Sequence, residues 1–122
     1  MSKLRVLIVD DEEDMRRMLR ALIEIANDGL SVAGEAVDGE EAVVRWREHR
    51  PDVIVLDEQM PKLSGLAAAE RILGEDPAQK IVLFTASPAE AVKQRAERVG
   101  VRVVSKRDVA RLVERLRACA AA

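Results

Sequence analysis

The segment LRVLIVDD, residues 4–11, decides the fold, because a mostly apolar run ends there in two carboxylates. Three later segments have the same form: VIVLD at 53–57, IVLFT at 81–85 and VRVVSK at 101–106. Such runs are typical of strands buried on both faces of a parallel sheet. Ligands of an open α/β sheet bind beyond the carboxyl ends of its strands. The sequence therefore predicts that four strands deliver charged or hydroxyl side chains to one edge. The predicted strands cover residues 4–9, 53–56, 81–84 and 101–104.

Helical segments separate these strands. The periodicity predicts helices at 13–26 and 39–49, a third after Gly65 that ends between 74 and 77, a fourth with Pro88 in its first turn, and a fifth with apolar residues from 109 to 119. Asn27-Asp28-Gly29 predicts a turn, and the alternating segment 30–36 an edge strand.

Five alternations of strand and helix predict a (βα)5 doubly wound α/β fold, with a parallel sheet covered by helices on both faces. The order 2-1-3-4-5, that of flavodoxin-like folds, makes the first and third strands neighbours. In that order, the three carboxylates Asp10, Asp11 and Asp57 converge at the sheet edge. Thr85 and Lys106 then approach them from the fourth and fifth strands.

The composition is that of an ordinary globular chain, with 122 residues, 48% apolar and 34% charged. We expect a single domain over 1–122. No segment is apolar over the length that a membrane span needs, and no signal peptide is evident, so a cytoplasmic location without membrane contact is expected. The single cysteine, Cys119, is expected to be a small core residue.

Charge is distributed unevenly along the chain. Residues 1–87 hold 11 Lys/Arg and 18 Asp/Glu, whereas residues 88–122 hold 9 Lys/Arg and 4 Asp/Glu. Solvated helix faces are the first interpretation of the basic part, a protein-docking surface the second and DNA the third. Trp46 and Phe84 are the only aromatic residues and offer no platform for bases, so direct nucleic-acid binding is not expected. Trp46 and Val44 are expected to be partly exposed on the 39–49 helix.

The convergent side chains suit a divalent metal and a phosphoryl group. Crowded carboxylates repel each other, and a hard cation such as Mg²⁺ relieves that repulsion with oxygen ligands. Asp57 could then act as a nucleophile towards phosphorus, with Lys106 and the Thr85 hydroxyl stabilising the developing charge. Taken alone, Asp11 is better explained as a helix cap, because acids at 11–14 open a helix. A cap does not explain Asp10 or Asp57.

The whole chain resembles the receiver domain of bacterial two-component response regulators. The resemblance rests on Val9-Asp10-Asp11, Asp57-x-x-Met60-Pro61-x-x-x-Gly65, Thr85-Ala86 and Lys106. The segments at 34–42 and 50–52 are similar to receivers that precede helix-turn-helix (LuxR-type) output domains.

The resemblance implies that Asp57 accepts a phosphoryl group from a sensor histidine kinase or phosphotransfer protein. It implies that Asp10 and Asp11, with Asp57 and the backbone carbonyl of Gln59, hold Mg²⁺. Thr85 would be the switch hydroxyl, and Lys106 would contact the phosphoryl group. The response would involve the fourth helix, fifth strand and fifth helix, with homodimerisation on phosphorylation as one expected outcome. The kinase, and whether the receiver acts alone or within a longer protein, are left open.

The sequence departs from the family pattern at three positions, one of which is Arg107 in place of the proline that follows the lysine in many receivers. Val103 stands where many receivers have an aromatic switch residue, and Glu58 adds a carboxylate near the site. Two alternative functions stay open: Val103 motivates the first, and the carboxylates, hydroxyl and lysine of the same site would serve the second. The first is a pseudo-receiver that only mediates contacts. The second is a small phosphohydrolase that forms an aspartyl-phosphate, which the lack of room for a substrate-binding cap disfavours. A phosphoacceptor that is not an enzyme in its own right is the leading interpretation.

Overall fold

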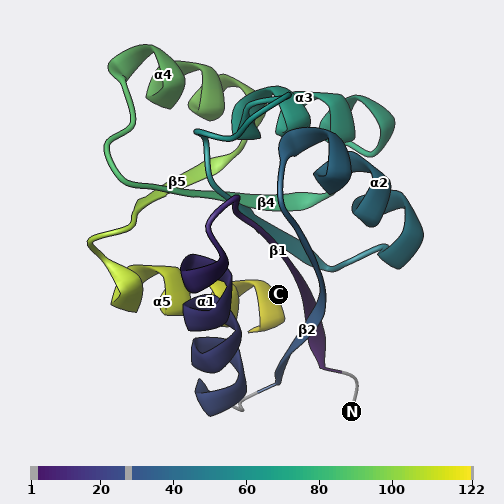
Figure 1. The fold of residues 1–122 in the computed structure, drawn as a ribbon, viewed down its shortest axis with the longest axis vertical. Coiled ribbons are helices and arrows are strands. Elements are labelled where there is room, and N and C mark those ends of the chain that lie inside the picture. The colour runs from purple at the N-terminus through teal and green to yellow at the C-terminus, as the bar shows by residue number, and fades with distance from the viewer. Residues whose placement is uncertain (1–2, 27–28, 122) are drawn as a thin grey trace.

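The computed structural model describes residues 3–26 and 29–121, in which five strands alternate with five helices (Figure 1). The strands are β1 (Leu4–Val9), β2 (Leu30–Ala36), β3 (Val53–Leu56), β4 (Lys80–Thr85) and β5 (Arg102–Ser105). The helices are α1 (Glu13–Ala26), α2 (Gly39–His49), α3 (Gly65–Glu75), α4 (Glu90–Val99) and α5 (Val109–Ala121). None of these described helices has the length and apolar character needed to cross a membrane.

The strands form one parallel sheet in the order β2-β1-β3-β4-β5, which confirms the predicted topology. β2 lies at one edge, as its alternating pattern predicts, and β5 lies at the other. Val9 at the end of β1 is in register with Leu56 at the end of β3. Because these two strands are neighbours, the residues that follow them emerge side by side at the carboxyl edge.

Helices cover both faces of the sheet. α1 and α5 lie on one face, and α2, α3 and α4 lie on the other (Figure 1). Successive residues of β1 point to opposite faces: Val6 and Ile8 pack with α1 and α5, whereas Leu7 and Val9 pack with the other three helices. The central strands are therefore buried on both sides, which is why they read as continuous apolar runs.

Several local expectations are corrected by the structure. Trp46 is fully buried, with only 1% of its surface exposed, and its Nε1 donates a hydrogen bond to Gln79 Oε1 at 2.9 Å. Val44 is exposed, as expected. Pro88 precedes the extended N-cap residue Ala89, so it lies in the loop before α4 and not in its first turn. Cys119 on α5 is half-buried and packs against the core between the sheet and the helices α1 and α5.

The turn predicted at Asn27-Asp28-Gly29 falls largely outside the described residues. Of its three positions only Gly29 is described, and its φ of +91° is in the region that favours glycine. This conformation is compatible with the predicted turn before β2.

Candidate functional site

Backbone hydrogen bonds hold the predicted site residues beyond the ends of the strands. The Asp10 amide donates to the Ala36 carbonyl at 3.1 Å, and the Asp57 amide donates to the Val9 carbonyl at 3.1 Å. The Lys106 amide donates to the Thr85 carbonyl at 3.0 Å. These bonds extend the parallel ladder one residue past each strand. The side chains that follow are therefore placed by the rigid sheet and not by flexible loops.

Lys106 joins the two buried carboxylates of the site. Its Nζ lies 3.0 Å from Asp10 Oδ2 and 3.0 Å from Asp57 Oδ2. Asp10 is 1% exposed and Asp57 is 6% exposed. One ammonium thus faces two buried carboxylates, so the group of three side chains carries excess negative charge when both acids are ionised. The structure brings these three predicted residues together.

The electrostatics of Asp10 and Lys106 follow from burial and from this shared contact. Burial raises the pKa of the Asp10 carboxyl, and the hydrogen bonds from the Glu12 amide and Lys106 only partly offset that effect. Burial acts to lower the pKa of the Lys106 ammonium, but its hydrogen bonds to Asp10 and Asp57 prevail and raise it. Ionised Asp10 is therefore destabilising without a further cation, whereas Lys106 holds its charge at neutral pH.

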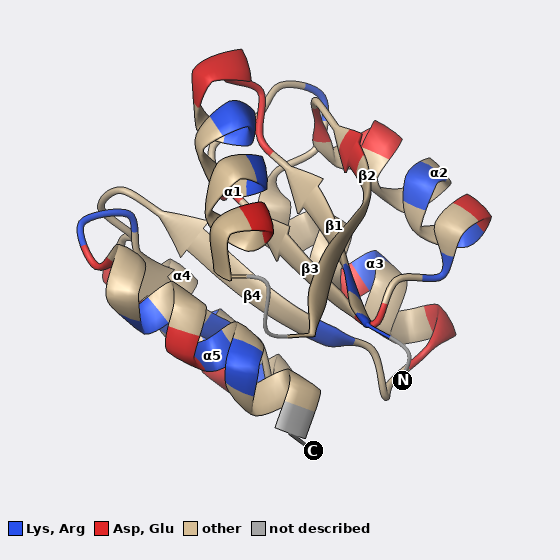
Figure 2. Ribbon diagram, turned by 90° about the horizontal axis from the view of Figure 1, so that it is seen from below, with Lys and Arg blue, Asp and Glu red and all other residues tan. Residues whose placement is uncertain are grey.

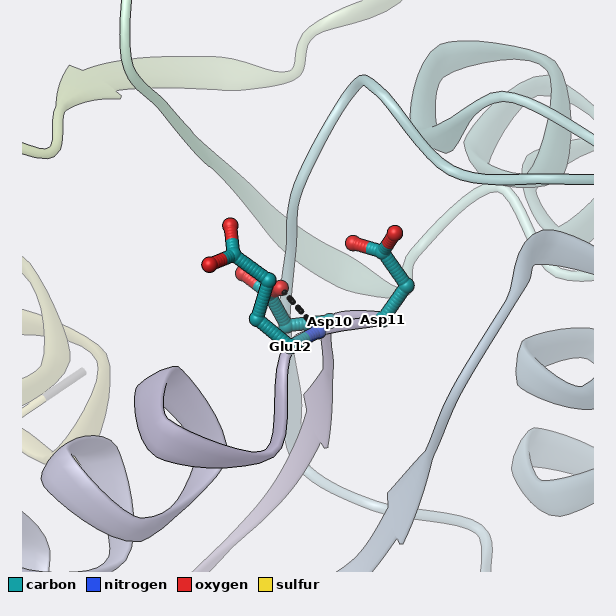
Figure 3. Close-up of side chains that lie close together, drawn as sticks. All are labelled: Asp10, Asp11 and Glu12. Atoms are coloured by element: carbon teal, nitrogen blue, oxygen red, sulfur yellow. Dashed lines mark hydrogen bonds between the residues drawn. The ribbon is translucent and has the colours of Figure 1, made fainter.

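A second acidic group stands on the β1–α1 turn. Carboxylate oxygens of Asp10, Asp11 and Glu12 lie within 4.8 Å of one another, and Asp11 and Glu12 are exposed (Figure 3). The Glu12 amide donates to Asp10 Oδ1 at 2.9 Å, which fixes the buried carboxylate relative to the turn. Sequence reasoning placed Glu12 only among the acids that open a helix. The uninterrupted acidic run directly after a buried strand was the available signal.

Two further predicted residues, Thr85 and Gln59, lie at the carboxyl edge of the sheet or in the loop that follows it. Thr85 ends β4, is 4% exposed and pairs with Ser105 of β5. Gln59 is exposed in the loop between β3 and α3. In the described part of the chain, no hydrogen bond joins the Thr85 side chain to Asp57, so its role as the switch hydroxyl stays a prediction. The role predicted for Gln59 concerns its backbone carbonyl and also stays a prediction.

The loop after Asp57 closes tightly on the start of α3. Asp57 Oδ1 accepts a hydrogen bond from the Glu58 amide at 2.8 Å, and the Glu58 carbonyl accepts one from the Gly65 amide at 2.9 Å. A Cβ on Gly65 would lie 1.9 Å from the Asp57 carbonyl oxygen, so only glycine permits this approach. The glycine of the Asp57-to-Gly65 pattern thus has a structural reason.

Glu58 points away from the acidic cluster and towards α3. Its Oε1 accepts a hydrogen bond from the Leu66 amide at 2.7 Å, in the first turn of the helix. Ser64 caps the same helix by accepting from the Ala67 amide at 3.2 Å. A carboxylate at a helix N-terminus accepts a hydrogen bond from a free amide and interacts favourably with the positive end of the helix dipole. The carboxylate that Glu58 adds next to Asp57 is therefore used to cap α3.

The donor set fits a hard divalent cation. Mg²⁺ takes oxygen ligands and accepts one or two carboxylates together with carbonyl and water oxygens. The buried Asp10 and the exposed Asp11 and Glu12 offer such oxygens within reach of one another. The excess negative charge around Lys106 gives a further electrostatic reason for a cation to bind there.

The fold and the site define a class of protein: a doubly wound α/β domain with an acidic pocket and a lysine at its carboxyl edge. The model of the response regulator receiver domain matches residues 6–117, and the chain belongs to that family. The sequence resemblance is thus confirmed. Receivers of this family work in two-component signalling, and phosphorylation on an aspartate and Mg²⁺ binding are general features of them.

Individual relatives agree with this assignment. The chain is 40% identical over 114 residues to the chemotaxis protein CheY of Thermotoga maritima, covering 92% of this chain and 93% of that protein. The crystal structure of a LuxR-family two-component response regulator from Aurantimonas is similar, with a TM-score of 0.88, 35% identity, and coverage of 96% of this chain and 84% of that chain. The response regulator domain of Thermotoga maritima CheB gives a TM-score of 0.87 at 29% identity, with 96% of each chain covered.

Proposed function

We propose that this chain accepts a phosphoryl group on Asp57 from a histidine kinase or phosphotransfer protein in a reaction that depends on Mg²⁺. The observation that carries the proposal is the placement of Asp57: it is buried at the carboxyl edge, 3.0 Å from the Lys106 ammonium and next to the acidic turn after β1. This arrangement combines a nucleophilic carboxylate, a fixed positive charge and a set of oxygen donors in one pocket.

The chemistry is a transfer between two nucleophiles. A carboxylate oxygen of Asp57 attacks the phosphorus of a phosphohistidine, the phosphorus–nitrogen bond breaks, and its electron pair returns to the imidazole. Lys106 neutralises charge on the phosphoryl oxygens, and the Thr85 hydroxyl can donate a hydrogen bond to one of them. Asp10, Asp11, Asp57 and the Gln59 carbonyl would hold Mg²⁺, and Glu12 lies within reach of the first two. When bound, the ion offsets the negative charge of the carboxylates and phosphoryl group.

We further propose that phosphorylation changes the surface formed by α4, β5 and α5. Thr85 ends β4, Lys106 directly follows the neighbouring β5, and a backbone hydrogen bond of 3.0 Å joins the two residues. If both side chains turn to the phosphoryl group, the loop at residues 86–89 and the end of β5 move with them. Such a change shifts an equilibrium between two conformations. With Val103 in place of an aromatic residue, this shift would occur without the rotation of a ring.

The remaining expectations stay proposals of the same kind. We propose a single phosphoacceptor domain over 1–122 that works in the cytoplasm, does not bind nucleic acid or membranes directly, and has no substrate turnover of its own. Steady turnover of a phosphomonoester with Mg²⁺ would instead support the phosphohydrolase. Gel filtration before and after treatment with acetyl phosphate tests homodimerisation, and an unchanged elution volume argues against it.

The decisive experiment is intact-protein mass spectrometry after incubation with acetyl phosphate and Mg²⁺. We expect one phosphoryl adduct in the wild type, and none in Asp57→Asn or in EDTA. Asp14→Asn is the matched control, because it removes an exposed carboxylate of α1 outside the pocket and should leave the adduct intact. A folded protein that binds Mg²⁺ but accepts no phosphoryl group, even from a phosphorylated kinase, would favour the contact-only alternative.

A further inference from the structure

Arg16 of α1 reaches back to the main chain of the proposed metal site. Its Nη1 donates a hydrogen bond to the Asp10 carbonyl at 2.7 Å, and its side chain is only 15% exposed. Within residues 3–26 and 29–121, no other hydrogen bond is made to this carbonyl, which belongs to a buried residue. A charged donor makes a strong hydrogen bond, and a buried carbonyl that loses its donor is costly. The Arg16 side chain therefore fixes the direction of the Asp10 carbonyl.

That carbonyl is part of the peptide unit between Asp10 and Asp11. Because a peptide unit is planar, a fixed carbonyl also fixes the Cα atoms of both residues relative to each other. The Asp10 carboxylate has further anchors in the Glu12 amide and Lys106. In the part of the chain that the structure describes, the exposed Asp11 carboxylate has no hydrogen bond or ion pair (Figure 3). Its approach to the Asp10 carboxylate therefore depends on the path of the backbone between them.

Glu35 of β2 holds Arg16 in this orientation. Glu35 Oε1 lies 3.2 Å from Arg16 Nε, and Glu35 Oε2 accepts a hydrogen bond from Arg20 Nε at 3.0 Å. Glu35 is in register with Ile8 of β1, so the sheet places this acid beside the strand that leads to Asp10. A guanidinium is planar, and one whose Nε and Nη1 both have partners has little freedom to rotate. A chain of contacts thus runs from β2 through Arg16 to the site.

Arg17 and Glu13 form an ordinary surface pair on the same helix. Their atoms lie 3.2 Å apart, but the two side chains are 74% and 68% exposed. Such pairs contribute little to stability. Among the described residues, Arg17 has its ion pair and hydrogen bond with Glu13 alone. Burial and the main-chain contact therefore distinguish Arg16 from a solvated cation of the helix.

The charge of Arg16 makes its role testable by the sign of an effect. α1 begins with an acidic run, and basic bands follow on its next turns (Figure 2). A guanidinium 2.7 Å from the Asp10 carbonyl repels a divalent cation bound by the adjacent carboxylates. If Arg16 acted only through its charge, its removal would strengthen cation binding. If it acts by holding the peptide, its removal weakens cation binding.

We propose that Arg16, held by Glu35, is a positioning residue of the metal site: it fixes the peptide between Asp10 and Asp11 so that both carboxylates are presented to one divalent cation. Arg16 acts through that peptide and not by contact with the cation or the phosphoryl group. The inference rests on the proposed function, because it concerns the organisation of the Mg²⁺ site that phosphorylation of Asp57 is proposed to need.

Binding of Mn²⁺, followed by the electron paramagnetic resonance signal of the free ion, tests this proposal on the full chain. Mn²⁺ prefers the same oxygen ligands as Mg²⁺. We expect Arg16→Met to raise the Kd by about tenfold, as is typical when a group that orients metal ligands is lost. Arg16→Lys keeps a donor and should recover part of the affinity. Glu35→Gln should raise the Kd by a smaller factor, and this effect should disappear when Arg16 is already Met.

Arg17→Met is the matched control, because it removes the same charge from the same helix. Its Kd should stay within about twofold of the wild type. Thermal melts in EDTA measure what each substitution costs the fold. An arginine with only a structural role would lower the melting temperature of Arg16→Met and leave the Kd unchanged. If Arg16→Met does not fold, Arg16→Lys and Glu35→Gln are compared with the wild type in its place.

Two results would overturn the proposal. One is a Kd that is unchanged or lower in the folded Arg16 and Glu35 variants, and the other is an equal effect of Glu35→Gln with and without Arg16. A phosphoryl adduct on Asp57 together with an unchanged Kd in Arg16→Met refutes this inference alone. The expected loss of Mn²⁺ affinity in Arg16→Met, in a protein whose wild type forms no adduct, supports the inference and refutes only the proposed phosphorylation.

Discussion

Replacing Glu58 by alanine should destabilise the fold without weakening the metal site. The Glu58 carboxylate accepts a hydrogen bond from the Leu66 amide at 2.7 Å, and this amide is one of the free donors at the start of α3. Removing the carboxylate leaves the Leu66 amide without its hydrogen-bond acceptor and incompletely solvated. It also removes a negative charge from the helix N-terminus. Ser64 stays in place and holds the neighbouring amide of Ala67, so the helix loses one of two caps.

The size of this effect follows from known capping energies. Loss of a capping acceptor costs about 0.5–2 kcal/mol, and loss of a charge at a partly exposed helix end costs about 0.3–1 kcal/mol. Because these contributions overlap, we expect Glu58→Ala to lower the free energy of unfolding by about 1–2 kcal/mol. For a domain of this size, the melting temperature should fall by roughly 3–8 °C. Glu58→Gln keeps an oxygen acceptor, so the free energy of unfolding should fall by about half as much as in Glu58→Ala.

Thermal melts in EDTA and in millimolar Mg²⁺ separate a cap from a metal ligand. A bound ion raises the melting temperature by mass action, and the increment grows with the logarithm of the ratio of ion concentration to Kd. If Glu58 is a cap, Glu58→Ala starts lower than the wild type but gains the same increment from Mg²⁺. Asp11→Ala is the matched comparison, because loss of that carboxylate should reduce the increment. The reasoning is refuted if Glu58→Ala melts with the wild type in EDTA, or if its Mg²⁺ increment disappears.

Three further substitutions probe the pocket. Burial raises the pKa of Asp10, so ionisation of this carboxyl lowers the stability of the fold as pH rises through the raised value. In EDTA at neutral pH, Asp10→Asn should therefore melt at a higher temperature than the wild type, and the difference should shrink towards about pH 4. With Mg²⁺ the wild type should melt at the higher temperature. Gly65→Ala forces a Cβ into the Asp57 carbonyl, and urea denaturation should show a loss of at least about 1–3 kcal/mol. Lys106→Met leaves two buried carboxylates without their cation and should cost about 3–5 kcal/mol by the same assay in EDTA. A melt of Asp10→Asn below the wild type, or wild-type stability in either other variant, would contradict these expectations.

The fold was predictable because its central strands are buried on both faces. A continuous apolar run that ends in a carboxylate has few other interpretations, and the bounds of β1, β2 and β3 match the prediction. β5 begins one residue later than predicted, because the Val101 amide donates to the Ala96 carbonyl at the end of α4. An apolar pattern cannot distinguish a residue in a helix cap from the first residue of a strand.

Trp46 shows where helical periodicity alone was insufficient. Its environment depends on Gln79, which lies 33 residues later and accepts the hydrogen bond from the indole nitrogen. Arg50 also covers the ring, 4.7 Å from its centroid. The burial of an amphipathic aromatic side chain requires a distant polar partner, and such a partner cannot be found from the pattern of one helix.

The site residues that could be placed from the sequence differ from the others in what holds them. Asp10, Asp57 and Lys106 are held by backbone bonds that continue the sheet, so knowledge of the strand order was enough to bring them together. Glu12 and Glu58 lie in turns, where the local path of the chain decides whether a carboxylate joins the acidic cluster or caps a helix. In this fold, the residues at strand ends could be placed from the strand order, but the side chains of the turns could be placed only from the three-dimensional structure.

The basic surface illustrates a third kind of information. The sequence shows the excess of Lys and Arg after residue 87, but it does not show which of those cations form ion pairs in the fold. The structure pairs Arg95 with Glu70 and Lys106 with the site, whereas among the described residues no ion pair is formed by Lys93, Arg102, Arg111 or Arg115. Because pairing depends on neighbours from other elements, an excess of charge becomes evidence for a partner only when the internal pairs are known.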